Sequence, residues 1–188
     1  MKSLFTIHAG EYVVGDYIER NFRRVKLWLP SKDTGVDFLV TDSKCQKVVS
    51  LQVKFSRDFL TTHLPANFQR LMRACGWWSL NRKKIDDSQA DYWVFVLVGF
   101  DRRCTDFVIV KPSDLLTRLD SIHGIAKIIQ SYLWVTQKER CWETRGLKQQ
   151  EQREIADGLY TNTVRDFSGF LNNWGPIQEL NRGKNESQ

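Results

Sequence analysis

Three polar side chains interrupt two segments that otherwise alternate between apolar and polar residues. Asp37 lies in GVDFLVT, and Gln52 and Lys54 lie in KVVSLQVKFS, which follows after the polar turn DSKCQK. Alternation is typical of β-strands, whose successive side chains point to opposite faces. If the two strands pair as a hairpin around residues 44 and 45, Asp37 lies opposite Gln52, and Lys54 shares their face. The other face is then apolar and contains Val36, Phe38, Val40, Val49, Leu51, Val53 and Phe55.

A glutamate upstream is placed to join this polar group of the hairpin. Over residues 7–24, apolar side chains recur at helical spacing. At about 100° per residue, Glu11 lies on the apolar side of the predicted helix, where an unpaired carboxylate is costly to bury. Gly15, one turn later, allows a close approach to the sheet. We therefore expect Glu11 to converge with the three polar residues of the hairpin.

Two carboxylates and an amide oxygen form a hard-oxygen site suited to Mg²⁺ or Mn²⁺. Such an ion keeps several waters, which are available for chemistry or for exchange with phosphate oxygens. Lys54, beside the ion, would orient or activate the attacking water and stabilise the charge that develops on phosphorus. The alternative is a solvated hairpin face without chemistry. The position of Glu11 favours the metal site.

The order of these residues resembles the PD-(D/E)XK nuclease superfamily: a helix glutamate, then G-V-D at the start of a strand, then Q-V-K on the next strand. The resemblance covers about residues 7–110 and is closest to the Mrr-type and archaeal Holliday-junction-resolvase-like members. It implies a metal-dependent endonuclease that hydrolyses phosphodiester bonds in DNA. The metal ligands that it implies are Glu11, Asp37, Gln52 and the backbone carbonyl of Val53, and the catalytic lysine is Lys54.

Two positions depart from the family pattern. Val36 stands where the nominal motif has proline, which is a common replacement. Gln52 replaces an acidic ligand and offers a carbonyl oxygen without charge, so we expect metal binding to be weaker or to depend more on Glu11. Because the Q-x-K variant is itself a feature of Mrr-like nucleases, it indicates a subfamily rather than an inactive site.

The elements that position these residues indicate an α/β protein. Strands are predicted over 24–29 and 105–110, and the apolar run over 91–100 is typical of a central strand buried on both faces. With the hairpin they form a central mixed sheet flanked by helices, which the resemblance makes restriction-endonuclease-like. Further helices are predicted over 66–84, from 112 onward, over 149–159 and over 164–174, with a short strand near 128–135.

The length of 188 residues suits one domain with a sizeable core. We expect residues 1–120 to form the nuclease-like core. Residues 121–188 are expected to form a C-terminal helical extension packed on the same domain, with the polar tail 181–188 disordered.

Basic residues outnumber acidic ones by 28 to 22 and occur in clusters, which favours a polyanionic partner such as DNA. Ser56 and Arg57 follow the hairpin lysine directly and are candidates to hold a backbone phosphate. Arg82, Lys83 and Lys84 follow two tryptophans and are candidates for the same task. The alternatives are strand-end polarity for the first pair and cations at a helix C-terminus, with core tryptophans, for the second group.

Several classes are excluded or disfavoured. The four cysteines lie about 30 residues apart without a histidine pair, which argues against a zinc site. No Gly-rich nucleotide-binding motif is present. Without a signal peptide or a long apolar span, we expect a cytoplasmic protein that does not contact membranes.

Three function hypotheses stay open. The preferred one is a Mg²⁺- or Mn²⁺-dependent DNA endonuclease, acting as a homodimer or within a larger nuclease complex. The second is a catalytically weak or inactive nuclease-fold module that binds DNA or protein. The third is a subunit of a defence or mobile-element complex that is active only with its partner.

Overall fold

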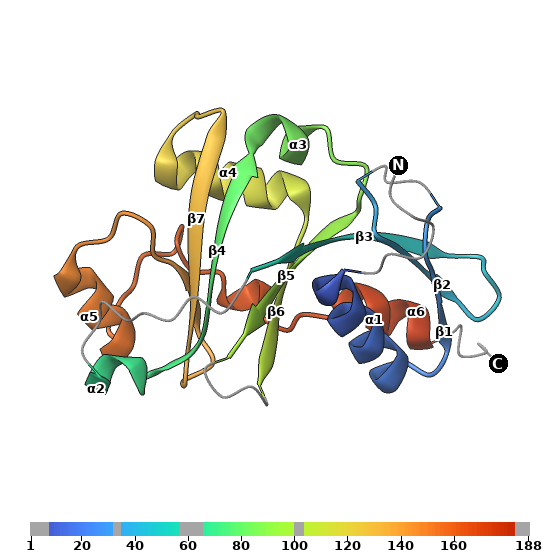
Figure 1. The fold of residues 1–188 in the computed structure, drawn as a ribbon, viewed down its shortest axis with the longest axis horizontal. Coiled ribbons are helices and arrows are strands. Elements are labelled where there is room, and N and C mark those ends of the chain that lie inside the picture. Colours follow the sequence, from blue (N-terminus) through green and yellow to red (C-terminus); the bar gives the residue numbers. More distant parts are fainter. Residues whose placement is uncertain (1–7, 32–34, 57–65, 100–103, 183–188) are drawn as a thin grey trace, which may run out of the picture.

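The computed structural model describes residues 8–31, 35–56, 66–99 and 104–182, and it contains two β-sheets (Figure 1). In spatial order, the strands of the first sheet are β1 (Val25–Trp28), β2 (Phe38–Asp42), β3 (Val48–Phe55), β5 (Tyr92–Val98) and β6 (Thr105–Val110). β3 and β5 are parallel and the other neighbours are antiparallel, so this sheet is mixed. The second sheet is antiparallel, in the order β4 (Met72–Asn81), β7 (Ile128–Thr136) and β8 (Cys141–Glu143).

Two helices cover one face of the first sheet. They are α1 (Ala9–Asn21) and α6 (Gly175–Arg182), which lie beside each other over β1, β2 and β3 (Figure 1). Their apolar residues Val14, Ile18, Ile177 and Leu180 are buried in one core cluster with the inward residues of the strands. Trp174, just before α6, completes this cluster. Burial of the apolar helix faces is the main source of stability for such short helices.

The opposite face of β5 packs against the second sheet and α4 (Pro112–His123). Trp93, Phe95 and Leu97 belong to this second core, whereas Val94 and Val96 between them belong to the core under α1. β5 is therefore buried on both faces, as the continuous apolar run of its sequence predicts. The predicted α/β class with a mixed sheet flanked by helices is confirmed.

The helix predicted over 66–84 is wrong, because only α2 (Ala66–Gln69) and α3 (Arg82–Asp86) are helical there. The residues between them form β4, which pairs with β7 along almost its whole length. Gly76 is unfavourable in the interior of a helix, and in β4 its missing side chain leaves room for the ring of Trp78. Pairing with a strand whose residues lie 47 to 64 positions further along the chain outweighs a helix-like local spacing.

The helix predicted over 164–174 is also wrong. A 3₁₀ turn, η1 (Ser168–Phe170), is its one helical part, and α6 begins only at Gly175. Backbone N–H groups that a helix would use are bonded elsewhere: the Ser168 N–H donates to Asp166 Oδ1, and the Asn172 N–H donates to the Phe107 carbonyl of β6. Asn172 also has a φ of 51°, outside the helical region.

The segment after residue 121 contributes strands as well as helices. β7 and β8 complete the second sheet, α5 (Gln149–Asp157) packs beside it, and α6 covers the first sheet. Of the predicted disordered tail, residues 181 and 182 end α6 and residues 183–188 lie outside the described residues. None of the helices in the described part of the chain is long and apolar enough to cross a membrane.

Candidate functional site

The hairpin of β2 and β3 has the predicted register. Phe38 pairs with Leu51 and Val40 pairs with Val49, as a fold around residues 44 and 45 predicts. The Asp37 N–H donates to the Leu51 carbonyl at 2.8 Å, one residue out of step with this register, and Val36 packs in the core on the opposite face from Phe38 and Val40. The predicted register is confirmed over residues 38–41, whereas the predicted position of Val36 on the face of Phe38 and Val40 is wrong, because the regular alternation ends at Phe38.

β3 continues beyond the end of its partner β2. From Val48 to Leu51 it pairs with β2, whereas its remaining residues, up to Phe55, pair with β5 alone. The edge of β3 that β2 leaves open is partly occupied by Asp37, whose Oδ2 accepts a hydrogen bond from the Val53 N–H at 2.7 Å. Because the N–H and C=O of a strand residue point to the same side, the Val53 carbonyl is directed to this open edge too.

The N-terminus of α1 lies against the end of β3. A Cβ at Gly10 would come within 2.5 Å of the Phe55 Cβ, so glycine is required for this approach. Gly15, the glycine named from the sequence, is less tightly packed, with Leu27 Cδ2 at 3.3 Å from a Cβ there. Glu11 Oε2 accepts a hydrogen bond from the His8 N–H at 3.1 Å, as a carboxylate at this helix position often does.

These elements surround one cavity of about 510 Å³. Its walls are formed by His8, Ala9, Gly10, Glu11, Asp37, Gln52, Val53, Lys54, Phe55 and Lys84. The structure therefore brings together every residue proposed from the motif as a metal ligand or catalytic lysine. α1 covers the face of the sheet to which Val53 points, whereas Gln52 and Lys54 point to the other face. Glu11 can still share a cavity with them, because no strand pairs with the edge of β3 beyond Leu51.

Lys54 is positioned by an aromatic ring. Its Nζ lies 4.7 Å from the centroid of Trp93, close enough for a cation–π interaction. Trp93 is 2% exposed, and its Nε1 donates to Ser88 Oγ at 2.8 Å, so the ring itself is fixed. The ammonium thus has a defined place in the cavity before any ligand binds.

The donor set fits a hard divalent cation, but with few charges. Glu11 and Asp37 each accept one backbone N–H, and a carboxylate has further lone pairs for a metal. Gln52 and the Val53 carbonyl add neutral oxygens, which Mg²⁺ and Mn²⁺ accept. No group of three His, Cys, Asp or Glu side chains arranged for a metal occurs within the described ranges. Binding by two carboxylates should accordingly be weak.

Most of the other residues predicted to contact phosphate are not found in this cavity. Ser56 is buried, and its Oγ accepts a hydrogen bond from the Trp77 N–H at 3.0 Å, so this hydroxyl links β3 to β4 instead of lining the cavity. Arg57 lies outside the described residues. Arg82 is paired with Asp120 at 2.6 Å and lines no part of this cavity.

The two lysines that follow Arg82 diverge. Lys83 is paired with Asp87 at 2.7 Å, which raises the pKa of its ammonium. Lys84 instead lines the cavity that contains Asp37 and Lys54. The sequence indicated a basic cluster here, but only the turn of α3 after β4 decides which lysine faces the site.

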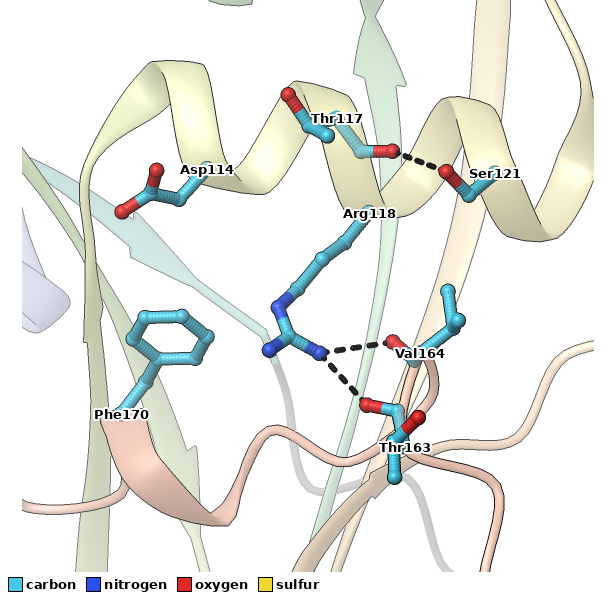
Figure 2. Close-up of a pocket in the computed structure, with 7 residues that line it drawn as sticks. All are labelled: Asp114, Thr117, Arg118, Ser121, Thr163, Val164 and Phe170. Carbon is cyan, nitrogen blue, oxygen red and sulfur yellow. Dashed lines mark hydrogen bonds between the residues drawn. The ribbon is translucent and has the colours of Figure 1, made fainter.

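A separate cavity of about 550 Å³ lies between α4 and the segment 163–170 (Figure 2). Arg118 is its central cation, and one guanidinium nitrogen donates to the carbonyls of Thr163 and Val164, both at 3.0 Å. The guanidinium also lies 5.2 Å from the centroid of the Phe170 ring. Arg118 thereby anchors the C-terminal segment to α4, and none of the residues proposed for chemistry lines this cavity.

Comparisons of the chain with protein-family models, with curated proteins and with solved structures find no match. The resemblance to the nuclease superfamily therefore depends on the motif residues and on their common cavity.

Proposed function

We propose that this protein is a Mg²⁺- or Mn²⁺-dependent endonuclease of restriction-endonuclease-like fold that hydrolyses phosphodiester bonds in DNA. One observation supports the proposal above all others. The open edge of β3 assembles Asp37, Gln52, the Val53 backbone and Lys54 around the same cavity as Glu11. Residues from three separate segments converge there, which a merely solvated hairpin face does not require.

The residues of the cavity have separable roles in this proposal. Glu11 and Asp37 supply the negative charge that holds the ion, and the oxygens of Gln52 and Val53 complete the protein ligands. A bound divalent ion polarises the scissile phosphate and lowers the pKa of the attacking water. Lys54, held over its tryptophan, donates a hydrogen bond to that water or to a non-bridging phosphate oxygen and stabilises the developing negative charge.

Cleavage assays with matched variants test the proposal. Plasmid, linear duplex, single-stranded and four-way-junction DNA are incubated with the protein in Mg²⁺ or Mn²⁺. Asp37→Asn should lower the cleavage rate by about 10²-fold or more, because it removes a ligand charge. Asp16→Asn, on α1 and outside the cavity, should leave the rate unchanged. Equal cleavage by the parent and the Asp37 variant would contradict the assignment.

Lys54→Gln separates catalysis from metal binding. Loss of the ammonium should slow cleavage by about 10²-fold or more. Mn²⁺ affinity, measured by calorimetry, should stay equal or rise, because a positive charge has been removed from beside the ion. A variant that loses Mn²⁺ binding together with cleavage would contradict this role for Lys54.

The small number of carboxylates favours a second candidate: a nuclease-fold module that binds DNA without cutting it. Calorimetry distinguishes the two. A site that binds Mn²⁺ in the parent and loses it in Asp37→Asn supports the nuclease. DNA binding without Mn²⁺ binding or cleavage supports the module. Cleavage that appears only when a partner protein is added supports a subunit of a larger complex.

A further inference from the structure

A second hollow of about 710 Å³ adjoins the cavity that contains Asp37. Gln52 and Lys84 line both spaces, so they form the boundary between them. The residues around the second hollow are Gly35, Gln52, Asn81, Lys83, Lys84, Asp87, Ser88, Gln89 and Lys127. We call this space the adjoining hollow.

The two spaces differ in charge. Two carboxylates and two ammonium groups line the first cavity, so its formal charges balance while no ion is bound. The adjoining hollow has three lysines and one carboxylate, and that carboxylate is paired with Lys83. No acidic side chain within the described ranges forms an ion pair with Lys84 or Lys127. The adjoining hollow therefore has an excess of positive charge.

Two neutral side chains of the adjoining hollow, Ser88 and Asn81, offer hydrogen-bond donors. Ser88 Oγ accepts from the Trp93 Nε1 at 2.8 Å and from the Ala90 N–H at 3.3 Å, so its own hydroxyl hydrogen is directed elsewhere. Asn81 Oδ1 accepts the Lys84 N–H at 3.3 Å, which leaves its amide NH₂ as the donor. No aromatic side chain among the described residues lines this space. Such a surface suits phosphate oxygens and offers no platform on which bases stack.

Lys127 comes from the connection between α4 and β7, far from α3 in sequence. Its position is fixed by the backbone, because the Lys127 carbonyl accepts a hydrogen bond from the Arg82 N–H at 3.0 Å at the start of α3. The C-terminal half of the chain thus contributes one of the two unpaired cations of this surface.

We propose that the adjoining hollow binds the sugar–phosphate backbone of the DNA strand on one side of the scissile phosphate. Lys84, at the boundary, contacts the phosphate next to the site of cleavage, and Lys127 contacts a phosphate further along. Recognition here is independent of base sequence, and the substrate is a polynucleotide instead of a mononucleotide. This inference rests on the proposed endonuclease function, because it assigns a binding site to the part of the same DNA substrate that lies beside the cleaved bond.

Salt-dependent binding without metal tests the inference separately from cleavage. Binding of a labelled 20-nucleotide duplex is followed by fluorescence anisotropy in EDTA between 50 and 200 mM NaCl. Each phosphate contact contributes about −0.9 to the slope of log K against log salt for duplex DNA. Lys84→Gln and Lys127→Gln should each reduce the magnitude of the slope by about 0.9, and the double variant by about 1.8. Lys148→Gln, which lies next to α5 and outside the hollow, is the control and should keep the parent slope.

Each result has a distinct meaning. Slopes in both variants equal to the parent slope would overturn the adjoining hollow as a backbone site and leave the endonuclease proposal intact. Reduced slopes in a protein that never cuts would support the hollow and overturn the endonuclease. A protein that neither binds nor cuts DNA would overturn both. A duplex of unrelated sequence that binds more than tenfold less tightly would overturn backbone-only recognition. Circular dichroism melts of each variant verify that it is folded.

Discussion

At the scale of single residues, Gln52 should limit how strongly the proposed metal site holds a cation. Glu11 and Asp37 are the carboxylates that line it, and the amide of Gln52 adds no charge. Gln52→Glu should therefore tighten Mn²⁺ binding by about tenfold or more, which corresponds to about 1.4 kcal/mol. Calorimetric titration measures the change. Gln130→Glu, on an exposed position of β7, is the matched control. Equal affinity in Gln52→Glu and the parent would mean that this side chain does not face the ion.

Much of the site follows from local sequence patterns. Alternation and the symmetry of a hairpin predict the pairing of residues 38–41 with β3, and helical periodicity directs Glu11 to the sheet. The roles of Lys84 and Gly10 could be identified only from the structure. Whether Lys84 faces the site depends on where β4 ends, and the tight contact of Gly10 depends on where Phe55 lies across the helix–sheet interface. Neither relation is encoded in the spacing of neighbouring residues.

At the scale of elements, the contact between α1 and β3 determines where Glu11 lies. Gly10→Ala would place a Cβ 2.5 Å from Phe55 Cβ, which cannot rotate away, so the helix start must shift. We expect a loss of about 1–3 kcal/mol in the free energy of unfolding, together with weaker Mn²⁺ binding. Alanine normally strengthens a helix relative to glycine, so any loss of stability reports the contact.

Gly15→Ala is the matched control for this interface. Its Cβ would lie 3.3 Å from the end of the Leu27 side chain, which is able to move. Urea denaturation should show a smaller loss than in Gly10→Ala, and Mn²⁺ affinity should be retained. Equal stability of Gly10→Ala and the parent would show that α1 does not approach β3 this closely.

β4 shows why element prediction fails where pairing is remote. Phe68, Leu71, Met72 and Cys75 have helical spacing, and no local feature between them signals a strand strongly. Residues 74–81 nevertheless pair one by one with residues 135–128 of β7. Strand preference depends on such neighbours, which a window of the sequence does not contain. β5 was predictable because its apolar run alone implies burial on both faces.

The connection between β7, β8 and the C-terminal segment depends on Asp166. Burial alone would raise the pKa of its carboxyl, but hydrogen bonds from Ser168 and the charge of Arg140 outweigh burial and lower the pKa. A lowered pKa means that the carboxylate stabilises the fold above the unfolded-state value of about 3.9, and that this stability is lost as pH falls through the folded-state value.

Asp166→Asn tests this pH dependence. At pH 7 the variant should be less stable than the parent by about 1–2 kcal/mol, because a charged hydrogen-bond acceptor is lost. The difference should begin to shrink below about pH 4, where the carboxyl of the unfolded parent takes up a proton, and should disappear once pH is below the lowered folded-state pKa. Urea denaturation at pH 7, 5 and 3 measures it. A difference of the same size at pH 3 and pH 7 would contradict the role of the charge.

At the scale of the whole molecule, the two cores share β5, and each also contains residues from beyond position 121. Ile129 and Leu133 of β7 belong to the core between the two sheets, and Ile177 of α6 belongs to the core under α1. The sequence predicts an extension packed on the nuclease-like core, but the partners of that extension are set by long-range packing that no local pattern reveals. The adjoining hollow likewise needs Lys127 from this half of the chain.

Truncation at α6 measures how far the core depends on its C-terminal end. A chain ending at Asn173 loses Trp174, Ile177 and Leu180, all nearly fully buried in the core under α1. Removal of a single buried side chain of these types costs about 2–5 kcal/mol, and whole domains are stable by only about 5–15 kcal/mol. The shortened chain should therefore lose its cooperative unfolding transition in calorimetry. A chain ending at Arg182 retains all of α6 and should unfold like the parent. A cooperative transition in the chain ending at Asn173, at the parent temperature, would mean that the first sheet does not need α6 to close its core.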